Sequence, residues 1–213
     1  MATSKISGMP VATSLSGTED IEVVQGGISK RATTRLIADL ADGVGRYTRY
    51  TRAIDWWAAA TSTTSQTSYG GTIVVSYPGT SVTRSRMAWA LPKRWDLGTV
   101  SFKVFGVVDT GGSAGHQAVW KMAAKAISAG DAMPTTANLS TGAQSAIMVW
   151  TANDDLLVSA ESAAITVDGS PTAGDLVVWD FWRDYTNSDD NSSAPFILIG
   201  VEIYWTASAS DDT

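Results

Sequence analysis

The chain has 213 residues, of which 44% are hydrophobic and 17% charged, and it contains one His and no Cys. The hydrophobic share is enough for a packed core, which excludes wholesale disorder, and the length fits one domain or one domain with an attached arm. The absence of Cys excludes disulfides, thiolate metal sites and thiol nucleophiles. A formal net charge of −6 argues against nucleic acid as a general partner.

Neither a targeting segment nor a membrane span is predicted. Residues 1–10 lack the apolar stretch that a signal peptide requires. The most apolar segment, residues 196–205, is interrupted by Gly200 and Glu202, whereas a span needs roughly 20 apolar residues. We therefore expect a soluble protein with no membrane partner.

The charged residues are unevenly distributed along the chain. Residues 43–103 contain eight basic and two acidic side chains, whereas from residue 150 onward Arg183 is the only base. One interpretation is a solvated acidic surface, and the other is ordered assembly in which the basic half meets an acidic surface on a neighbouring copy. The eight basic residues are Arg46, Arg49, Arg52, Arg84, Arg86, Lys93, Arg94 and Lys103.

Residues 1–45 are predicted to form an extended N-terminal arm with one short helix. Gly, Ser and Thr are frequent, and residues 19–25 have the alternation of a short strand, with Ile21 and Val23 on one face. Residues 30–40 carry apolar side chains at helical spacing, and a helix of that length is marginal unless it packs on a partner. The arm residues expected to contact a partner are Ile21, Val23, Val24, Leu36 and Ile37.

Residues 46–70 are predicted to be a linker rich in aromatic residues, Ser and Thr, in which 61–68 form a loop or an exposed strand. From residue 71 to residue 213, short segments of alternating hydrophobicity follow one another at the spacing typical of sandwiches. The predicted fold is therefore mainly β, a jelly-roll-like antiparallel β-sandwich preceded by the arm. The predicted strands are 72–77, 86–91, 98–108, 118–127, 143–151, 156–160, 163–167, 175–183 and 196–206.

Strict alternation indicates which side chains face the core of the sandwich. Segment 118–130 is ambiguous, because its Ala, Met and Lys residues favour a helix, while as a strand it has one wholly apolar face. We favour the strand. The residue sets expected to share a face are Ala118, Trp120, Met122, Ala124 and Ala126; Val100, Phe102 and Val104; Val177, Trp179 and Phe181; and Ile197, Ile199, Val201, Ile203 and Trp205.

No catalytic, cofactor-binding or metal-binding residues are predicted. His116 lies in a glycine-rich loop that lacks the Lys-Ser/Thr pair of a phosphate-binding loop. Residues 184–191 are rich in oxygen ligands but lack the Gly and the closing Glu of an EF-hand, so we interpret them as an acidic loop, with a loose divalent-cation site as the alternative. A carboxylate pair for glycoside hydrolysis would have to come from Asp154, Asp155, Asp180 and Asp184.

Nine Trp residues are a heavy share for a chain of this length. Most are expected to fill the sandwich and a subunit interface, where Trp supplies a large contact area, and a carbohydrate-stacking surface is the alternative. Trp182 lies on the opposite face of its predicted strand from Trp179, which favours a surface role. The candidates for interface or glycan contact are Trp56, Trp57 and Trp182.

Two parts of the chain resemble proteins of tailed-bacteriophage virions. Residues 6–33 (ISGMPVATSLSGTEDIEVVQGGISKRAT) are similar to a short N-terminal module of phage fibres and appendages. Residues 87–100 (MAWALPKRWDLGTV), with 161–167 and 199–201 further on, look like a β-rich module of phage structural proteins. The resemblance implies a virion appendage, commonly trimeric, and it carries over no catalytic residue.

The resemblance and the composition lead to one expectation and two alternatives. We expect a non-enzymatic homotrimer on the virion surface, assembled in the host cytoplasm, that serves as a capsid decoration or head-fibre protein. Its arm would anchor it to other virion proteins, and no cofactor is expected. The first alternative is a tail-fibre or baseplate adaptor whose β domain binds a host surface glycan, and the second is a lytic glycan hydrolase.

Overall fold

The computed structural model describes residues 20–25, 28–33, 45–58, 65–108, 110–134, 139 and 142–207. The chain divides into two compact units, one formed by Met1–Gly45 with Ala209–Thr213 and the other by Arg46–Ser208. Among the described residues, the first unit consists of two strands, β1 (Asp20–Gln25) and β2 (Ile28–Thr33).

β1 and β2 pair as an antiparallel hairpin. β1 confirms the strand predicted over 19–25. The helix predicted over 30–40 is wrong at its start, because residues 30–33 belong to β2, where pairing with β1 supplies the backbone hydrogen bonds that a short isolated helix would have to provide alone. The rest of that segment, with Leu36 and Ile37, lies outside the described residues.

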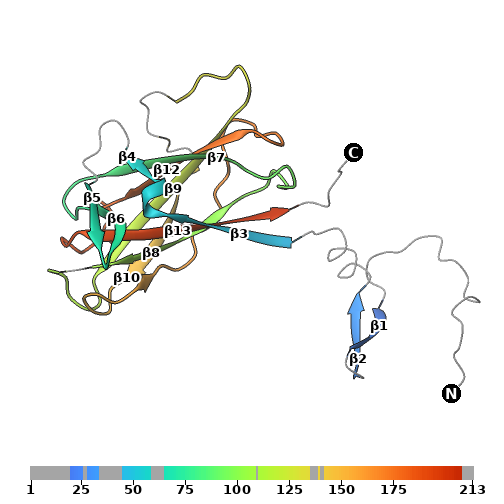
Figure 1. Ribbon diagram of the computed structural model, residues 1–213, viewed down its shortest axis with the longest axis horizontal. Helices are drawn as coiled ribbons and strands as arrows, with labels where there is room; N and C mark the ends of the chain where they lie inside the picture. The colour runs from blue at the N-terminus through green and yellow to red at the C-terminus, as the bar shows by residue number, and fades with distance from the viewer. Residues whose placement is uncertain are drawn as a thin grey trace, which may run out of the picture. The chain divides into compact units, whose positions relative to one another are not determined.

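The larger unit is a sandwich of two antiparallel sheets (Figure 1). The sheet that we call the β13 sheet contains β3 (Gly45–Arg52), β5 (Ser65–Tyr69), β6 (Thr72–Tyr77), β8 (Ser101–Val107), β11 (Leu157–Val158) and β13 (Phe196–Ala207). The sheet that we call the β12 sheet contains β4 (Trp57–Ala58), β7 (Arg84–Ala90), β9 (Gln117–Ile127), β10 (Gln144–Val149) and β12 (Leu176–Arg183). A 3-10 turn, η1 (Ala53–Asp55), joins β3 to β4, and in the described part of the chain no helix has the length and apolar character needed to cross a membrane.

Eight of these strands have the order of a jelly roll. They lie as β6-β13-β8-β11 in one sheet and as β7-β12-β9-β10 in the other, and these pairs are antiparallel. In a jelly roll the chain crosses repeatedly between two four-stranded sheets, as β6 to β13 do here. The predicted jelly-roll-like sandwich is thus confirmed, with β3, β4 and β5 added to its two sheets.

The strand predictions within the sandwich are largely confirmed. β6 occupies residues 72–77 as predicted, and β9 confirms the strand favoured for 118–127. β9 pairs with β10 on one side and with β12 on the other, and this pairing overrides the helical propensity of its Ala and Lys residues. The strand predicted over 163–167 is wrong, because this segment forms only an isolated bridge, between Ile165 and Val100.

The described residues between 46 and 70 contribute three strands to the sandwich, which corrects the prediction of a linker. β3 and β5 join the β13 sheet, and β4 joins the β12 sheet. β5 is an exposed strand, one of the two alternatives for 61–68. The segment lacks the strong alternation of the later strands, but Thr and Tyr suit strands well, and a strand at the edge of a sheet needs little apolar surface of its own.

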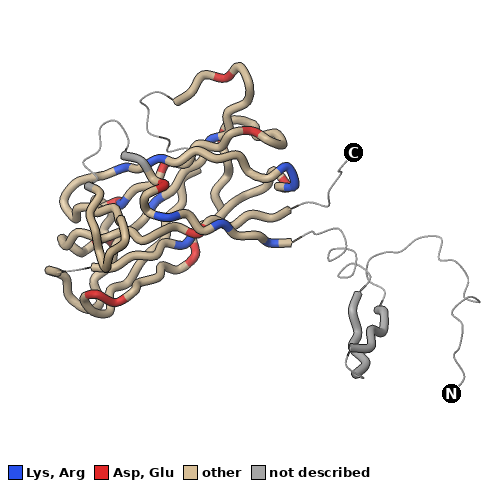
Figure 2. Tube along the Cα trace, in the orientation of Figure 1, with Lys and Arg blue, Asp and Glu red and all other residues tan. Residues whose placement is uncertain are grey.

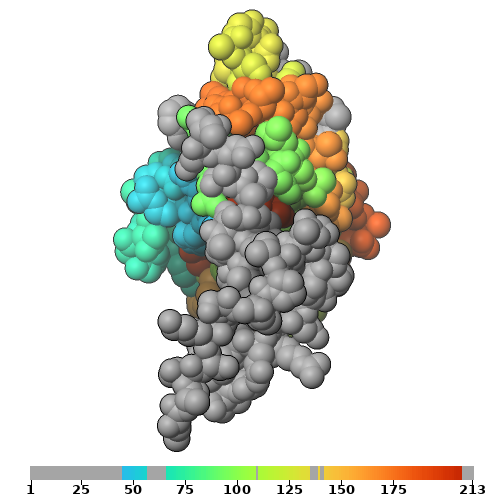
Figure 3. Space-filling model, turned by 90° about the vertical axis from the view of Figure 1, so that its right-hand side faces the viewer, coloured from blue at the N-terminus to red at the C-terminus, as the bar shows by residue number. Residues whose placement is uncertain are grey.

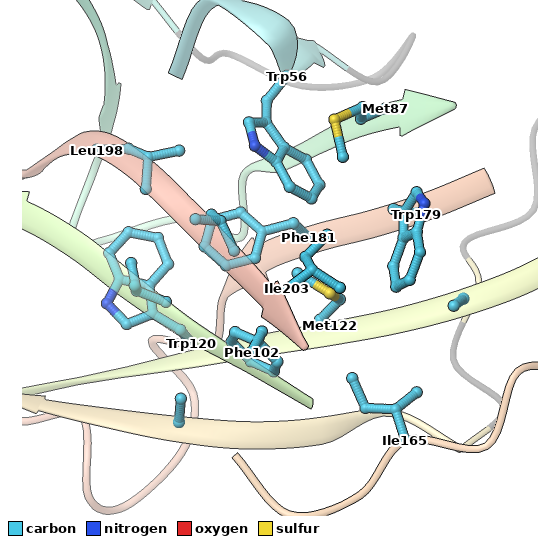
Figure 4. Close-up of a cluster of buried hydrophobic side chains, with 14 of the residues drawn as sticks. Trp56, Met87, Phe102, Trp120, Met122, Ile165, Trp179, Phe181, Leu198 and Ile203 are labelled. Carbon is cyan, nitrogen blue, oxygen red and sulfur yellow. The ribbon is translucent and has the colours of Figure 1, made fainter. Parts of the chain in front are cut away.

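The core between the two sheets is built around Phe181 of β12 (Figure 4). The ring of Phe181 stacks on Trp120, with 5.1 Å between the centroids. It also packs against the rings of Trp56, Tyr77 and Phe102. The face sets predicted in and around β8, β9 and β12 all belong to this core, which confirms them.

A β-bulge between Leu198 and Gly200 interrupts the regular pairing of β13. A bulge inserts one residue, so the side chains before and after it alternate out of phase. Before the bulge, Phe196 and Leu198 face the core, whereas Ile197 and Ile199 belong to a small apolar cluster on the outer face. The face predicted for the last strand is therefore wrong before the bulge and right after it.

Two loops lie together at one end of the sandwich, one after β9 and one before β12 (Figure 3, yellow and orange). The Ser128 hydroxyl donates to the Asp175 carboxylate at 2.9 Å. The Ala126 N–H donates to the Asp168 carbonyl at 2.8 Å. These hydrogen bonds tie the two loops to each other and to the sheet.

Candidate functional site

The tryptophan side chains that the structure describes are all buried. Trp56 is 1% exposed, and its indole N–H donates to the Thr51 hydroxyl at 3.0 Å. Trp182 is 5% exposed, and the Arg84 guanidinium covers its ring at 3.7 Å from the centroid. Neither is therefore available for the predicted glycan or interface contact, and the Trp57 side chain lies outside the described residues. Similarly buried, at 9% or less, are Trp89, Trp95, Trp120, Trp150, Trp179 and Trp205.

The carboxylates considered for glycoside hydrolysis are all engaged in structural contacts. Asp154 and Asp155 accept hydrogen bonds from neighbouring hydroxyl groups. Asp184 forms an ion pair with Lys121 at 2.7 Å. Asp180 is fully buried and pairs with two arginines.

The buried Asp180 organises a charged network on the outer face of the β12 sheet. Its Oδ2 lies 3.1 Å from an Arg84 nitrogen and 3.5 Å from an Arg86 nitrogen, and it accepts the Leu139 N–H at 2.9 Å. The same two guanidinium groups donate to the carbonyls of Leu139 and Pro134. Burial raises the pKa of the Asp180 carboxyl, while the two positive charges oppose that rise. The network holds residues 134 and 139 against the sheet.

The acidic segment 184–191 forms an anchored loop. Its Asp190 carboxylate turns inward and pairs with the fully buried Arg183 guanidinium at 2.6 Å. Arg183 also donates to the carbonyls of Ser192 and Ala194. Within the described residues, no group of three or more His, Cys, Asp or Glu side chains is placed to hold a metal ion.

The glycine-rich loop that contains His116 packs on the indole of Trp150. The His116 ring meets the Trp150 ring edge-on, with 6.4 Å between the centroids. The backbone N–H of Trp150 donates to the backbone carbonyl of His116 at 2.8 Å. A Cβ at Gly112 would fall 0.7 Å from a carbon of the Trp150 ring, so the glycine is needed there for packing. These contacts indicate that His116 helps to pack the loop against Trp150.

The outer face of the β13 sheet carries a continuous apolar row, which we define as Val158, Phe105, Gly200 and Tyr50. Val158 lies opposite Phe105 on the neighbouring strand, and Phe105 lies opposite Gly200 on β13. Tyr50 from β3 lies over Gly200, where a Cβ would come within 2.3 Å of its hydroxyl oxygen, and packs edge-on against Phe105 at 5.7 Å. Tyr50 and Val158 are each 48% exposed, so solvent reaches both ends of the row.

A charged cluster lies beside the apolar row on the same face. The Arg46 guanidinium sits 4.2 Å from the centroid of the Tyr204 ring and forms an ion pair with Glu161. The Ser101 hydroxyl donates to Glu161 at 2.6 Å. Burial alone would raise the pKa of the Glu161 carboxyl, but Ser101 and Arg46 hold it below its usual range. Together these residues line a small polar hollow of about 210 Å³.

A second, apolar hollow lies where β3 and β6 meet along β13. β8 occupies one edge of β13, so β6, which pairs with residues 196–198, and β3 share the other edge. The hollow between them measures about 230 Å³. We call this hollow the notch, and it is lined by Tyr50, Arg52, Ile54, Thr72, Ile73 and Ile199.

The fold is a jelly-roll β-sandwich whose β13 sheet carries the apolar row and the charged cluster on its outer face. No model of a known protein family matches the chain, and no curated protein matches it. Among solved structures, it is similar to TmCBM27, a carbohydrate-binding module whose specific mannan recognition has been studied, with a TM-score of 0.39 and 9% identity over 76% of this chain and 98% of the module. A protein of unknown function from Shewanella oneidensis MR-1 has a TM-score of 0.29 and 10% identity over 85% of this chain and 98% of its own.

Apart from Arg46, which is one of the eight basic residues of the uneven charge pattern, the residues of this face were not among those singled out from the sequence. Tyr50 and Arg46 lie in the segment predicted to be a linker, and Phe105 and Val158 come from two other strands. One signal was present: residues 46–52 read RYTRYTR, a short repeat in which charged and aromatic residues occur on both faces of a strand. The row itself forms only when four separate strands pair, and no local pattern in the sequence indicates that pairing.

Proposed function

We propose that the chain is a non-enzymatic structural protein of a bacteriophage virion, whose sandwich associates with further copies as a homotrimer through the outer face of the β13 sheet. The observation that carries this proposal is the apolar row beside a charged cluster. Protein interfaces are enriched in Tyr, Phe and Arg around a dry centre, and contiguous exposed apolar surface marks interaction sites. The similarity of residues 6–33 to a phage attachment module supports a place on the particle.

The residues on which the two alternatives depended are buried or engaged in other contacts. Trp56 and Trp182, which were the candidates for stacking on a sugar, are 1% and 5% exposed. Hydrolysis of a glycosidic bond needs two carboxyl groups that face a common cleft. The four carboxylates considered for that role are engaged in separate ion pairs and hydrogen bonds.

Val158→Asp is expected to convert the homotrimer into monomers, because it places a charge at the exposed end of the apolar row. Sedimentation velocity or light scattering after gel filtration measures the mass directly. Val149→Asp is the matched control, since Val149 is 49% exposed on a strand of the other sheet and its variant should remain trimeric. A monomeric wild-type protein, or equal behaviour of the two variants, would contradict the proposed assembly.

Removal of residues 1–44 is expected to leave the sandwich folded and to abolish attachment to the particle. The described strands of the sandwich all begin at or after Gly45, and the unit Arg46–Ser208 is compact by itself. Far-ultraviolet circular dichroism tests folding, and the protein content of purified particles tests attachment. Particles that still carry the shortened protein would rule out the N-terminal residues as the anchor.

A further inference from the structure

We propose that Leu97 is a second point of contact with the virion protein that holds the N-terminal residues, and that its side chain enters an apolar pocket with an acidic rim on that protein. This inference deepens the proposed function by giving the chemistry of the surface to which the chain attaches, and it rests on that function. Four features of residues 92–98, PKRWDLG, lead to it: their backbone conformation, their fixed position, their place in the sandwich and their charge. We call this segment the Leu97 turn.

Leu97 has a backbone conformation that disfavours its side chain. Its φ is 58°, in the left-handed region, where a side chain crowds the following carbonyl oxygen. In the described ranges the other non-glycine residues with positive φ are Asp154 and Ser170, which are both polar. Leu97 is also 43% exposed, so burial in the core does not offset the cost of this conformation. Strained residues of this kind gather at sites of function, which makes Leu97 a candidate contact.

The Leu97 turn is held in place on both sides of Leu97. Before it, Trp95 is 3% exposed and belongs to the core between the sheets. The Asp96 backbone N–H donates to the Thr206 carbonyl at 3.0 Å, and the Asp96 carboxylate accepts the Gly98 N–H at 2.8 Å. The exposed side chain of Leu97 is therefore positioned before any partner arrives, and such preorganisation lowers the entropy cost of binding.

The Leu97 turn lies at the end of the sandwich where the N-terminal residues join it. Among the described strands β3 is the first of the sandwich, and its Arg46 lines one hollow with Thr99 and Thr206. Thr99 comes two residues after Leu97. A virion protein that holds residues 1–44 is thus tethered to this end. A contact through one leucine is weak alone, but a tether makes it intramolecular and raises its effective concentration.

The charge of the turn gives the chemistry of the rim around the pocket. The turn after β7 carries basic residues (Figure 2, blue). Of these, Lys93 is exposed, and among the described residues no carboxylate forms an ion pair with it. Acidic side chains around the pocket complement this charge, and charges at the rim of an interface mainly set its orientation and its rate of association.

The Leu97 turn also lies apart from the surface proposed for the trimer. It follows β7 and precedes β8, so it lies at strand ends, whereas the apolar row crosses the β13 sheet through Phe105 and Gly200, which lie within their strands. Variants of the turn should therefore change attachment and leave the trimer intact.

Binding of the purified full chain to particles assembled without it tests the proposal. Leu97→Asn removes the apolar side chain and suits the left-handed conformation, because Asn is enriched there. Its affinity for the particle should fall at least about tenfold, while the midpoint of urea denaturation stays the same or rises. Leu97→Met keeps an apolar side chain and should bind within about threefold of wild type. Lys93→Glu should slow association, most strongly at low salt.

Val82→Asn is the matched control, because Val82 is also 43% exposed. It follows β6, whose last residue pairs with the first residue of β13, so it lies at the opposite end of the sandwich and its variant should bind as wild type does. Full binding of Leu97→Asn, an equal loss in Leu97→Met or Val82→Asn, or a lower denaturation midpoint of Leu97→Asn would overturn the inference alone. A wild-type chain that does not bind the particle would refute the proposed function and the inference with it.

Discussion

Replacing Phe181 by Ala is expected to lower the free energy of unfolding by about 3–5 kcal/mol. The Phe181 ring is fully buried and touches four other aromatic rings, contributed by both sheets and by the segment after β3. Truncation removes apolar surface from the centre of the core and leaves a cavity that large, rigid indole rings cannot fill by small shifts. Urea denaturation followed by Trp fluorescence measures the loss, with an unchanged slope as the sign of a two-state comparison.

Leu176→Ala provides the control for this measurement. Leu176 lies on the same strand as Phe181 but is 37% exposed, so its truncation should cost well under half as much. Equal losses for the two variants would mean that the cluster around Phe181 is not the centre of the core.

Asp190→Asn is expected to destabilise the protein by about 3–5 kcal/mol, because it removes the charge that compensates a buried guanidinium. Arg183 is fully buried, and both of its nitrogens that face Asp190 lie within 2.8 Å of the carboxylate. One oxygen of Asp190 also accepts the Val119 N–H at 3.0 Å. Taking one partner from a buried ion pair leaves the other charge without water or counter-charge, which costs more than the intact pair contributes.

The neighbouring residue offers a matched control for the buried pair. Asp189 is exposed, and Asp189→Asn makes the same chemical change one position away. Its effect on the free energy of unfolding should stay within about 0.5 kcal/mol, as for most surface substitutions. A small effect at both positions would show that residues 184–194 are held by their turns and not by Arg183.

Alternation in the sequence predicted the sandwich well, because every second residue of a strand between two packed layers must be apolar and face the core. Val177, Trp179 and Phe181 face the core as predicted, since any strand between two packed layers must put one set of side chains inward. β9 was also predicted, although its composition favours a helix, because one face of the strand is wholly apolar. These features depend on the local sequence alone.

The surface was harder to predict, because a pattern indicates which way a side chain points and not what covers it. Trp182 points away from the core, yet Arg84 lies over its ring, and residues 134 and 139 are tied to the same sheet. The apolar row depends on the register of β11, β8, β13 and β3, which come from distant parts of the sequence. No window along the chain contains that information, so the candidate site emerged only from the three-dimensional arrangement.

The bulge divides β13 into two halves that pair with different strands. Residues before the bulge pair with β6 of the β5–β6 hairpin, and β3 pairs with the remainder of the strand. The sets of side chains that face inward and outward are exchanged between the two halves. An altered side chain in one half leaves the phase of the other half untouched. The set of side chains that faces the core can therefore vary in one half of β13 independently of the other half.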